Sequence, residues 1–176
     1  VVPGVMRVLT DHEISTLGLL LGARWSSMSG PDMHQENLAI GSVNLSTEAG
    51  SLTLSLKLQI LDIAGEPDDY PCLHVSDWSP STSQVLRNGN SYFHGRGEVV
   101  RGVLVLMETT RGTSLGELAF ENIAHTAVTV QLSTSWITIV RSSHLSDTFD
   151  IQRTSSLEDV VLPETLDEWE SDLMFQ

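Results

Sequence analysis

The chain has 176 residues, of which 40% are hydrophobic and 18% charged, and its net charge is -14. These values predict one soluble globular domain with a sizeable core and exclude wholesale disorder. The negative charge disfavours nucleic acid and anionic membrane surfaces, so we expect neither as a partner, whereas basic proteins remain suitable partners. No run approaches the roughly 18 apolar residues of a membrane span, and the single cysteine, Cys72, favours a reducing, cytoplasmic location.

The negative charge is concentrated at the C-terminal end. Residues 147–176 contain nine acidic side chains and one basic side chain, whereas residues 1–146 contain fourteen and eight. This distribution predicts a β-rich domain over residues 1–146, followed by an acidic linker and tail over residues 147–176.

A short helix is predicted near the N-terminus. Thr10 and Glu13 have the spacing of a capping box. Ile14, Leu17 and Leu21 then follow at the spacing of one helix face, which predicts a helix over residues 11–23. Residues 26–37 show no periodicity and are predicted to form a loop.

From Leu38 onward the sequence indicates β-strands. Apolar and polar residues alternate over residues 51–61, which is typical of a strand with one buried face. The turn residues Glu48, Ala49 and Gly50 separate this strand from an earlier run, and Asn88-Gly89 is the strongest hairpin signal. Further strand candidates are Cys72–Trp78, Gln84–Arg87, Tyr92–Arg101, Gly102–Glu108, Leu115–Glu121, Ala127–Leu132 and Trp136–Arg141. Many short strands with turns predict an antiparallel β-sandwich or barrel with one N-terminal helix.

The acidic tail is expected to form a second short helix. Pro163 suits a first helical turn, and Leu166, Trp169 and Leu173 then fall at helical spacing among acidic residues. An acidic amphipathic helix with a tryptophan anchor is typical of a segment that docks into a partner. The alternative is that this helix packs back on its own sheet and covers an edge.

The segment from Tyr92 to Glu98 is a candidate ligand site. In a strand, Tyr92, His94, Arg96 and Glu98 would project from one face and could bind an anionic ligand or carry out acid–base chemistry. Phe93, Gly95 and Gly97 would occupy the other face, where the glycines allow another backbone to approach closely. The alternative is a solvated outer face on which Arg96 and Glu98 neutralise each other.

Two other groups of residues are candidate metal ligands. Cys72 and His74 share one side of their strand and could supply two ligands, with His94 as a third, although a buried cysteine acting as a small apolar residue is more common. Asp62, Glu66, Asp68 and Asp69 surround a turn but lack the spacing of a calcium-binding loop. We therefore expect no metal and no cofactor.

No nucleophile elbow, phosphate-binding loop or zinc-protease motif is present in the sequence. The leading hypothesis is a non-enzymatic protein-binding or assembly module that presents an acidic surface and tail, with homo-oligomerisation as one version. The alternative is a small-molecule-binding or hydrolytic β-barrel that uses the Tyr92, His94, Arg96 and Glu98 row. A third hypothesis is an acidic inhibitor of a basic target.

Overall fold

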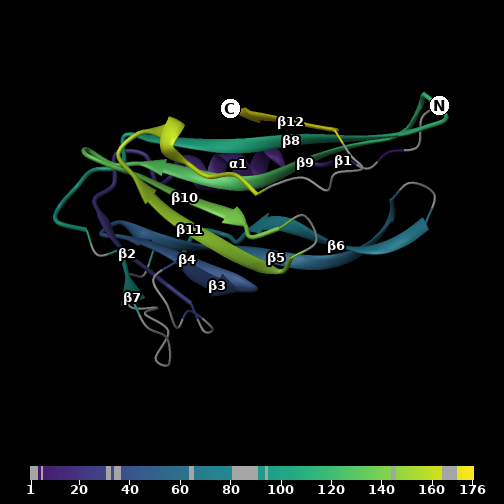
Figure 1. The fold of residues 1–176 in the computed structure, drawn as a ribbon. Coiled ribbons are helices and arrows are strands. Elements are labelled where there is room, and N and C mark those ends of the chain that lie inside the picture. The colour runs from purple at the N-terminus through teal and green to yellow at the C-terminus, as the bar shows by residue number, and fades with distance from the viewer. Residues whose placement is uncertain are drawn as a thin grey trace.

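The computed structural model describes residues 4, 6–30, 33, 37–63, 66–80, 91–93, 95–143, 146–163 and 170–176. These residues form a two-layer β-sandwich with one α-helix, α1 (Asp11–Gly18) (Figure 1). Neither sheet closes on itself, so the predicted mainly-β fold is confirmed as a sandwich and not as a barrel.

The first sheet contains seven strands. Its strand order is β12-β8-β9-β10-β11-β3, and β1 pairs with β9 outside this order. The strands are β1 (Met6–Arg7), β3 (Leu38–Ile40), β8 (Gly102–Ser114), β9 (Glu117–Gln131), β10 (Trp136–Arg141), β11 (Thr148–Thr154) and β12 (Glu170–Phe175). The β1–β9 pair is parallel, and the other pairs of this sheet are antiparallel.

The second sheet contains five antiparallel strands in the order β6-β5-β4-β2-β7. The strands are β2 (Trp25–Ser29), β4 (Ser42–Thr47), β5 (Gly50–Ile63), β6 (Glu66–Val75) and β7 (Ser91–Tyr92). The alternation of residues 51–61 is confirmed as a strand, because Leu52, Leu54 and Leu56 are buried on one face of β5. Leu58 and Ile60 continue the pattern but are exposed, so β5 extends beyond the core.

The core lies between the two sheets. Apolar side chains of the first sheet, such as Val128 and Ile139, pack with Leu54 and Met28 of the second sheet. At one corner the chain passes directly from β3 to β4 through Gly41, whose φ of 74° favours glycine. The N–H of Gly41 donates to the carbonyl of Asp147, and its carbonyl accepts from the N–H of Leu56, so the sheets are joined there by backbone hydrogen bonds.

A second, smaller apolar cluster lies on the first sheet apart from the main core. It consists of Leu106, Ala127 and Val140, against which Leu162 and Phe175 pack. The chain reaches this cluster after β11 through a short 3-10 helix, η1 (Leu157–Asp159). The C-terminal segment is therefore part of the fold, because it covers apolar side chains of β8, β9 and β10.

The predicted helix is shorter than expected. The capping box of Thr10 and Glu13 is confirmed, but α1 ends at Gly18 and not at residue 23. The chain turns instead, since Gly22 adopts a φ of 77° and its N–H donates to the carbonyl of Val100.

The predicted loop over residues 26–37 is wrong in its first part, because β2 occupies Trp25–Ser29. Ser27 and Ser29 are buried between neighbouring strands, so their polarity concealed the strand in the sequence. Residues 31, 32 and 34–36 lie outside the described residues, as do the predicted Gln84–Arg87 strand and the Asn88-Gly89 turn.

Strand boundaries also differ in the second half of the chain. The strand predicted at Gly102–Glu108 continues to Ser114 as β8, and the reversal occurs at Leu115 and Gly116, which have φ values of 54° and 81°. The two strands predicted over residues 115–121 and 127–132 are one long strand, β9, whereas the strand predicted at Trp136–Arg141 is confirmed as β10.

The predicted acidic C-terminal helix is not supported. Residues Glu170–Phe175 form β12, which pairs antiparallel with β8. Leu173 and Phe175 are two residues apart on a strand, so both side chains can reach the cluster around Leu106. The helical spacing that ends at Leu173 was therefore misleading. Pro163, at the predicted helix start, lies in no helix, and Leu166 and Trp169 lie outside the described residues.

Candidate functional site

A groove between α1 and the first sheet is a candidate binding site. Its volume is about 460 Å³, within the range typical of ligand sites. The apolar lining comes from α1, from residues just before and after it, and from β8: Leu9, Ile14, Leu17, Leu21, Val103 and Val105. The polar lining residues are Asp11, His125 and Gln176. We call this site the α1 groove.

Hydrogen bonds at its first turn fix the position of α1. The backbone N–H of Glu13 donates to the Thr10 hydroxyl, and a carboxylate oxygen of Glu13 accepts from the N–H of Thr10 at 2.8 Å. The other Glu13 oxygen accepts from the N–H of Val75 at 2.9 Å, which attaches the helix to β6. Burial raises the pKa of Glu13, but these hydrogen bonds and the nearby His74 outweigh it and hold the pKa below 4.5.

The imidazole ring of His125 is held in place in the groove by a hydrogen bond from the backbone. The backbone N–H of Leu9 donates to Nδ1 of His125 at 2.9 Å, so the neutral ring carries its proton on Nε2. Burial lowers the pKa of His125 from 6.5, although the charge of Glu13 opposes this shift. At neutral pH His125 is therefore uncharged, and it supplies one N–H donor to an otherwise apolar wall.

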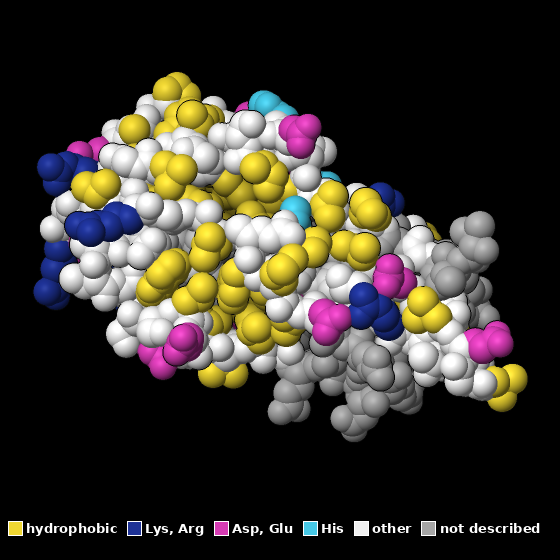
Figure 2. All heavy atoms as spheres, turned by 90° about the horizontal axis from the view of Figure 1, so that it is seen from above, with side chains coloured by type: hydrophobic (Ala, Val, Ile, Leu, Met, Phe, Trp, Pro, Cys, Tyr) yellow, Lys and Arg dark blue, Asp and Glu magenta, His cyan; other side chains and the backbone are white. Residues whose placement is uncertain are grey.

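Exposed apolar side chains surround the groove. Ile14 of α1, Leu21 just after α1 and Met174 of β12 are 40%, 52% and 52% exposed. Figure 2 looks down on the side where β8 and β12 lie in Figure 1, and hydrophobic side chains gather across the middle of this face. Large contiguous apolar surfaces are characteristic of interaction sites on folded proteins.

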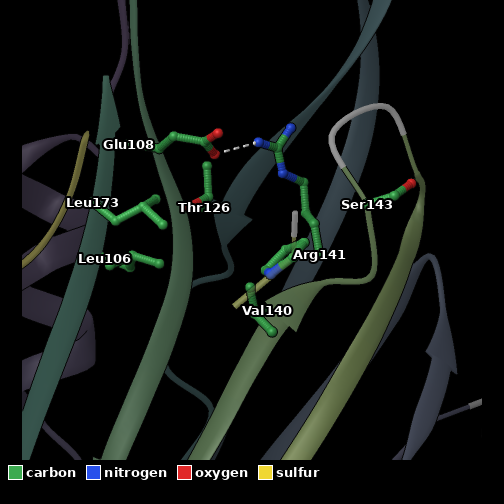
Figure 3. Close-up of a pocket in the computed structure, with 8 residues that line it drawn as sticks. Leu106, Glu108, Thr126, Val140, Arg141, Ser143 and Leu173 are labelled. Atoms are coloured by element: carbon green, nitrogen blue, oxygen red, sulfur yellow. Dashed lines mark hydrogen bonds and ion pairs between the residues drawn. The ribbon is translucent and has the colours of Figure 1, made fainter. Parts of the chain in front are cut away.

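A second cavity lies beside Arg141 and belongs to the packing of the fold. Its volume is only about 10 Å³, which is room for little more than one water molecule. Figure 3 shows Arg141 extending from β10 toward Glu108 of β8, and Nη2 of Arg141 donates to the Glu108 carboxylate at 3.1 Å. The guanidinium also lies 4.9 Å from the centre of the Tyr70 ring and donates to the carbonyl of Pro71.

This buried cluster connects the two sheets. The side chain of Arg141 is 3% exposed and that of Glu108 is 12% exposed, so both charges are removed from water. Burial raises the pKa of Tyr70, although the charge of Arg141 opposes this shift, so the phenol remains neutral. The cluster is satisfied internally, and its cavity is too small for a substrate.

The structure separates the residues of the predicted Tyr92 to Glu98 row. The strand ends at Tyr92, because Phe93 adopts a φ of 51°, and Tyr92 packs against the main core. Glu98 accepts hydrogen bonds from Arg153 at 3.2 Å and from the Thr134 hydroxyl at 2.9 Å.

Arg96 is exposed, and His94 lies outside the described residues. A ligand-binding role for the row remains a prediction, but Tyr92 and Glu98 do not form one alternating face. The predicted close approach at Gly95 is confirmed, since a Cβ there would lie 2.1 Å from the carbonyl oxygen of Trp25.

Cys72 and His74 line a smaller pocket on the other side of the start of α1. Cys72 is buried, and its thiol contacts the carbonyl of Tyr70 at 3.6 Å. Nδ1 of His74 lies 3.6 Å from Glu13, and its Nε2 lies 3.4 Å from the amide of Gln59. Among the residues that the structure describes, no three His, Cys, Asp or Glu side chains converge as metal ligands would.

The acidic residues around the predicted turn at residues 62–69 lie largely on two paired strands. Asp62 and Asp69 lie on the long β5–β6 hairpin, in which Asp62 pairs with Pro67 and Asp69 pairs with Ile60.

Sequence reasoning found only part of the α1 groove. Ile14, Leu17 and Leu21 were identified as one helix face, and they form one wall. The opposite wall was missed, because Val103, Val105 and His125 look like ordinary strand residues and nothing in the sequence indicates that they face α1. Leu173, a predicted partner-binding residue, lies on β12 and lines the small cavity beside Arg141, not the α1 groove.

No protein-family model matches the chain, and neither a curated protein nor a solved structure is significantly similar to it. Within the described ranges, neither α1 nor η1 has the length and apolar character of a membrane-spanning helix.

Proposed function

We propose that the chain is a non-enzymatic protein-binding module and that its binding face is the α1 groove together with the exposed apolar side chains of β12. The observation that carries this proposal is an open groove of about 460 Å³ with apolar walls, flanked by the exposed Leu21 and Met174. A partner that inserted apolar side chains into this groove would gain about 25 cal/mol for each Å² of apolar surface buried.

The charge of the chain supports a protein partner with a basic character. The net charge is -14. A chain with this charge would attract a basic protein and accelerate its approach, and it would repel an acidic protein. The apolar groove would then supply the affinity, since buried apolar contacts at the centre of an interface usually dominate binding energy.

The test is a selection of peptides displayed on phage, followed by binding measurements with two variants. Leu21→Arg places a charge at the groove, whereas Leu115→Arg changes a fully exposed side chain of the β8–β9 turn. We expect selected peptides to bind the wild type and L115R equally and L21R at least about tenfold more weakly, which corresponds to about 1.4 kcal/mol. Selected peptides that bind L21R as well as the wild type would overturn the proposal.

A second candidate function is the binding of a small neutral apolar molecule in the same groove. The observation in its favour is His125, which offers one hydrogen-bond donor within a mostly apolar lining whose described residues include no cationic side chain. The probe is 2-nonanone, a chain with a single acceptor, measured against nonanoate by calorimetry. Selective binding of the ketone that is weakened in His125→Phe would favour this function, and equal or undetectable binding of the two probes would dismiss it.

A further inference from the structure

β12, the last strand in the chain, forms one edge of the first sheet. β12 pairs with β8 along six residues, and the ladder continues at Gln176. The N–H of Gln176 donates to the carbonyl of Val105 at 2.8 Å, and the N–H of Val105 donates to the carbonyl of Gln176 at 2.9 Å. Both backbone groups of Gln176 therefore point toward β8.

The alternation of an antiparallel ladder then determines which groups of β12 point away from β8. Residues 172 and 174 face β8 as Gln176 does, so the N–H and C=O groups of residues 171, 173 and 175 point outward. Among the described residues no strand pairs with this outer edge, since β12 is the end of the strand order. The edge offers three donors and three acceptors in a row.

Side chains on both faces of β12 suit an added strand. Gln176 lines the α1 groove, so Met174 lies on the same face of the strand by the two-residue period. Leu173 lies on the opposite face, toward Leu106 and Val140, and is 39% exposed. A strand placed beside β12 would therefore bring alternate side chains next to Met174 and the groove, and the others next to Leu173.

The charge around β12 specifies the kind of strand. The sequence of β12 contains two acidic residues and no basic one, and the net charge of the whole chain is -14. Asp172 pairs with Arg111 at 2.6 Å but keeps 77% of its side chain exposed. Like charges would oppose the pairing of β12 with a second copy of itself, whereas a basic segment would be attracted.

Resting on the proposed function, we infer that the partner contributes an extended, basic segment that adds to the outer edge of β12 as a further strand. Main-chain hydrogen bonds from residues 171, 173 and 175 supply the pairing, and the face of the α1 groove receives apolar side chains. The negative charge of the chain and the exposed Asp172 select basic residues on the segment.

The probe is a seven-residue capped peptide of alternating valine and lysine. Its binding to the full chain is measured by fluorescence anisotropy at low salt. Two control peptides accompany it: one with glutamate in place of lysine, and one with every amide N-methylated. We expect the valine–lysine peptide to bind and both controls to bind at least about tenfold more weakly, because the first loses charge attraction and the second cannot donate hydrogen bonds.

The matched variants are Leu173→Pro and Leu173→Ala. Both remove the leucine side chain, but only the proline removes an outward N–H while leaving the ladder to β8 intact. We expect L173P to bind the valine–lysine peptide at least about tenfold more weakly than L173A. The thermal midpoint and the far-ultraviolet spectrum show whether L173P is folded, and Ser171→Pro replaces it if it is not.

Three results would overturn the inference: no detectable binding of the valine–lysine peptide, equal binding by L173P and L173A, or equal binding of the lysine and glutamate peptides. A dimer of the wild type that L173P dissociates would also overturn it and would identify the occupant as a second copy. The two proposals can fail separately. If one of these results is obtained but the phage-displayed peptides still bind Leu21→Arg more weakly than the wild type, only the strand-addition inference is overturned and the protein-binding function stands.

Discussion

Leu9 and His125 are separated by 116 residues along the chain and joined by a hydrogen bond of 2.9 Å from a backbone N–H to Nδ1. The bond connects the segment immediately before α1 to the middle of β9, and both residues line the α1 groove. A protonated His125 carries a hydrogen on Nδ1 and cannot accept this bond. The geometry of the groove therefore depends on the neutral form of one histidine.

Acid should destabilise the chain through His125. Burial lowers its folded pKa below the ordinary 6.5, so the unfolded chain takes up this proton first as the pH falls. Stability from this group is complete above pH 6.5 and is lost as the pH falls from there through the folded pKa. We expect the thermal midpoint of the wild type to fall between pH 7.5 and 5.0 more steeply than that of His125→Gln. An equal slope in the two proteins would contradict this assignment.

Removing one partner of the Arg141–Glu108 pair should cost far more than breaking an exposed pair. Arg141→Met leaves the Glu108 carboxylate buried without the cation that lies 3.1 Å away, and we expect a loss of about 3–5 kcal/mol. The control is Glu48→Gln, whose carboxylate lies 3.9 Å from Arg24 with both side chains mostly exposed, and we expect a loss below about 1 kcal/mol. Urea denaturation measures both, and similar losses would refute the structural role of the buried pair.

Gly95 should tolerate no side chain. A Cβ there would lie 2.1 Å from the carbonyl oxygen of Trp25, which belongs to the backbone and cannot move without distorting β2. We expect Gly95→Ala to lower the free energy of unfolding by about 2 kcal/mol or more. Gly18→Ala is the matched control, because its Cβ meets nothing within 4 Å and alanine favours a helix by up to about 1 kcal/mol. A neutral effect of G95A would show that the backbone contact is looser than described.

Cys72 should be unreactive in the folded chain. Burial raises the pKa of its thiol, although the charges of Arg7 and Arg141 oppose this shift, so little thiolate forms at pH 8. We expect iodoacetamide to alkylate the native chain at least about a hundredfold more slowly than the chain in urea, on the basis of thiolate content and burial together. Mass spectrometry of timed samples provides the rates, and rapid native alkylation would show that the pocket beside His74 admits reagents to the sulfur.

The sequence predicted local features well where one physical signal dominated. The capping box at Thr10 identified the start of α1, and the alternation of five apolar residues identified β5, because each pattern reports directly on a local backbone state. Two errors have a common cause. β2 is rich in serine, and the end of the chain is rich in acid, so neither resembles a strand until neighbouring strands supply the burial and hydrogen bonds.

The candidate site was less accessible to sequence reasoning. One wall, from Ile14 to Leu21, is visible as a helix face, but the other comes from β8 and from His125 on β9. Their proximity to α1 results from the sheet topology, which no local pattern encodes. The same reason explains why the regular row from Tyr92 to Glu98 was overestimated, since a single residue with positive φ at Phe93 interrupts it.

The parallel pairing of β1 with β9 has a consequence for how the chain reaches its native state. Met6 and Arg7 emerge from the ribosome more than a hundred residues before their partners Ile123 and Ala124. Closing so long a loop costs entropy before the contact returns any energy, which slows folding. The β1 segment must therefore remain unpaired, accessible to chaperones and proteases, until the β8–β9 hairpin has formed.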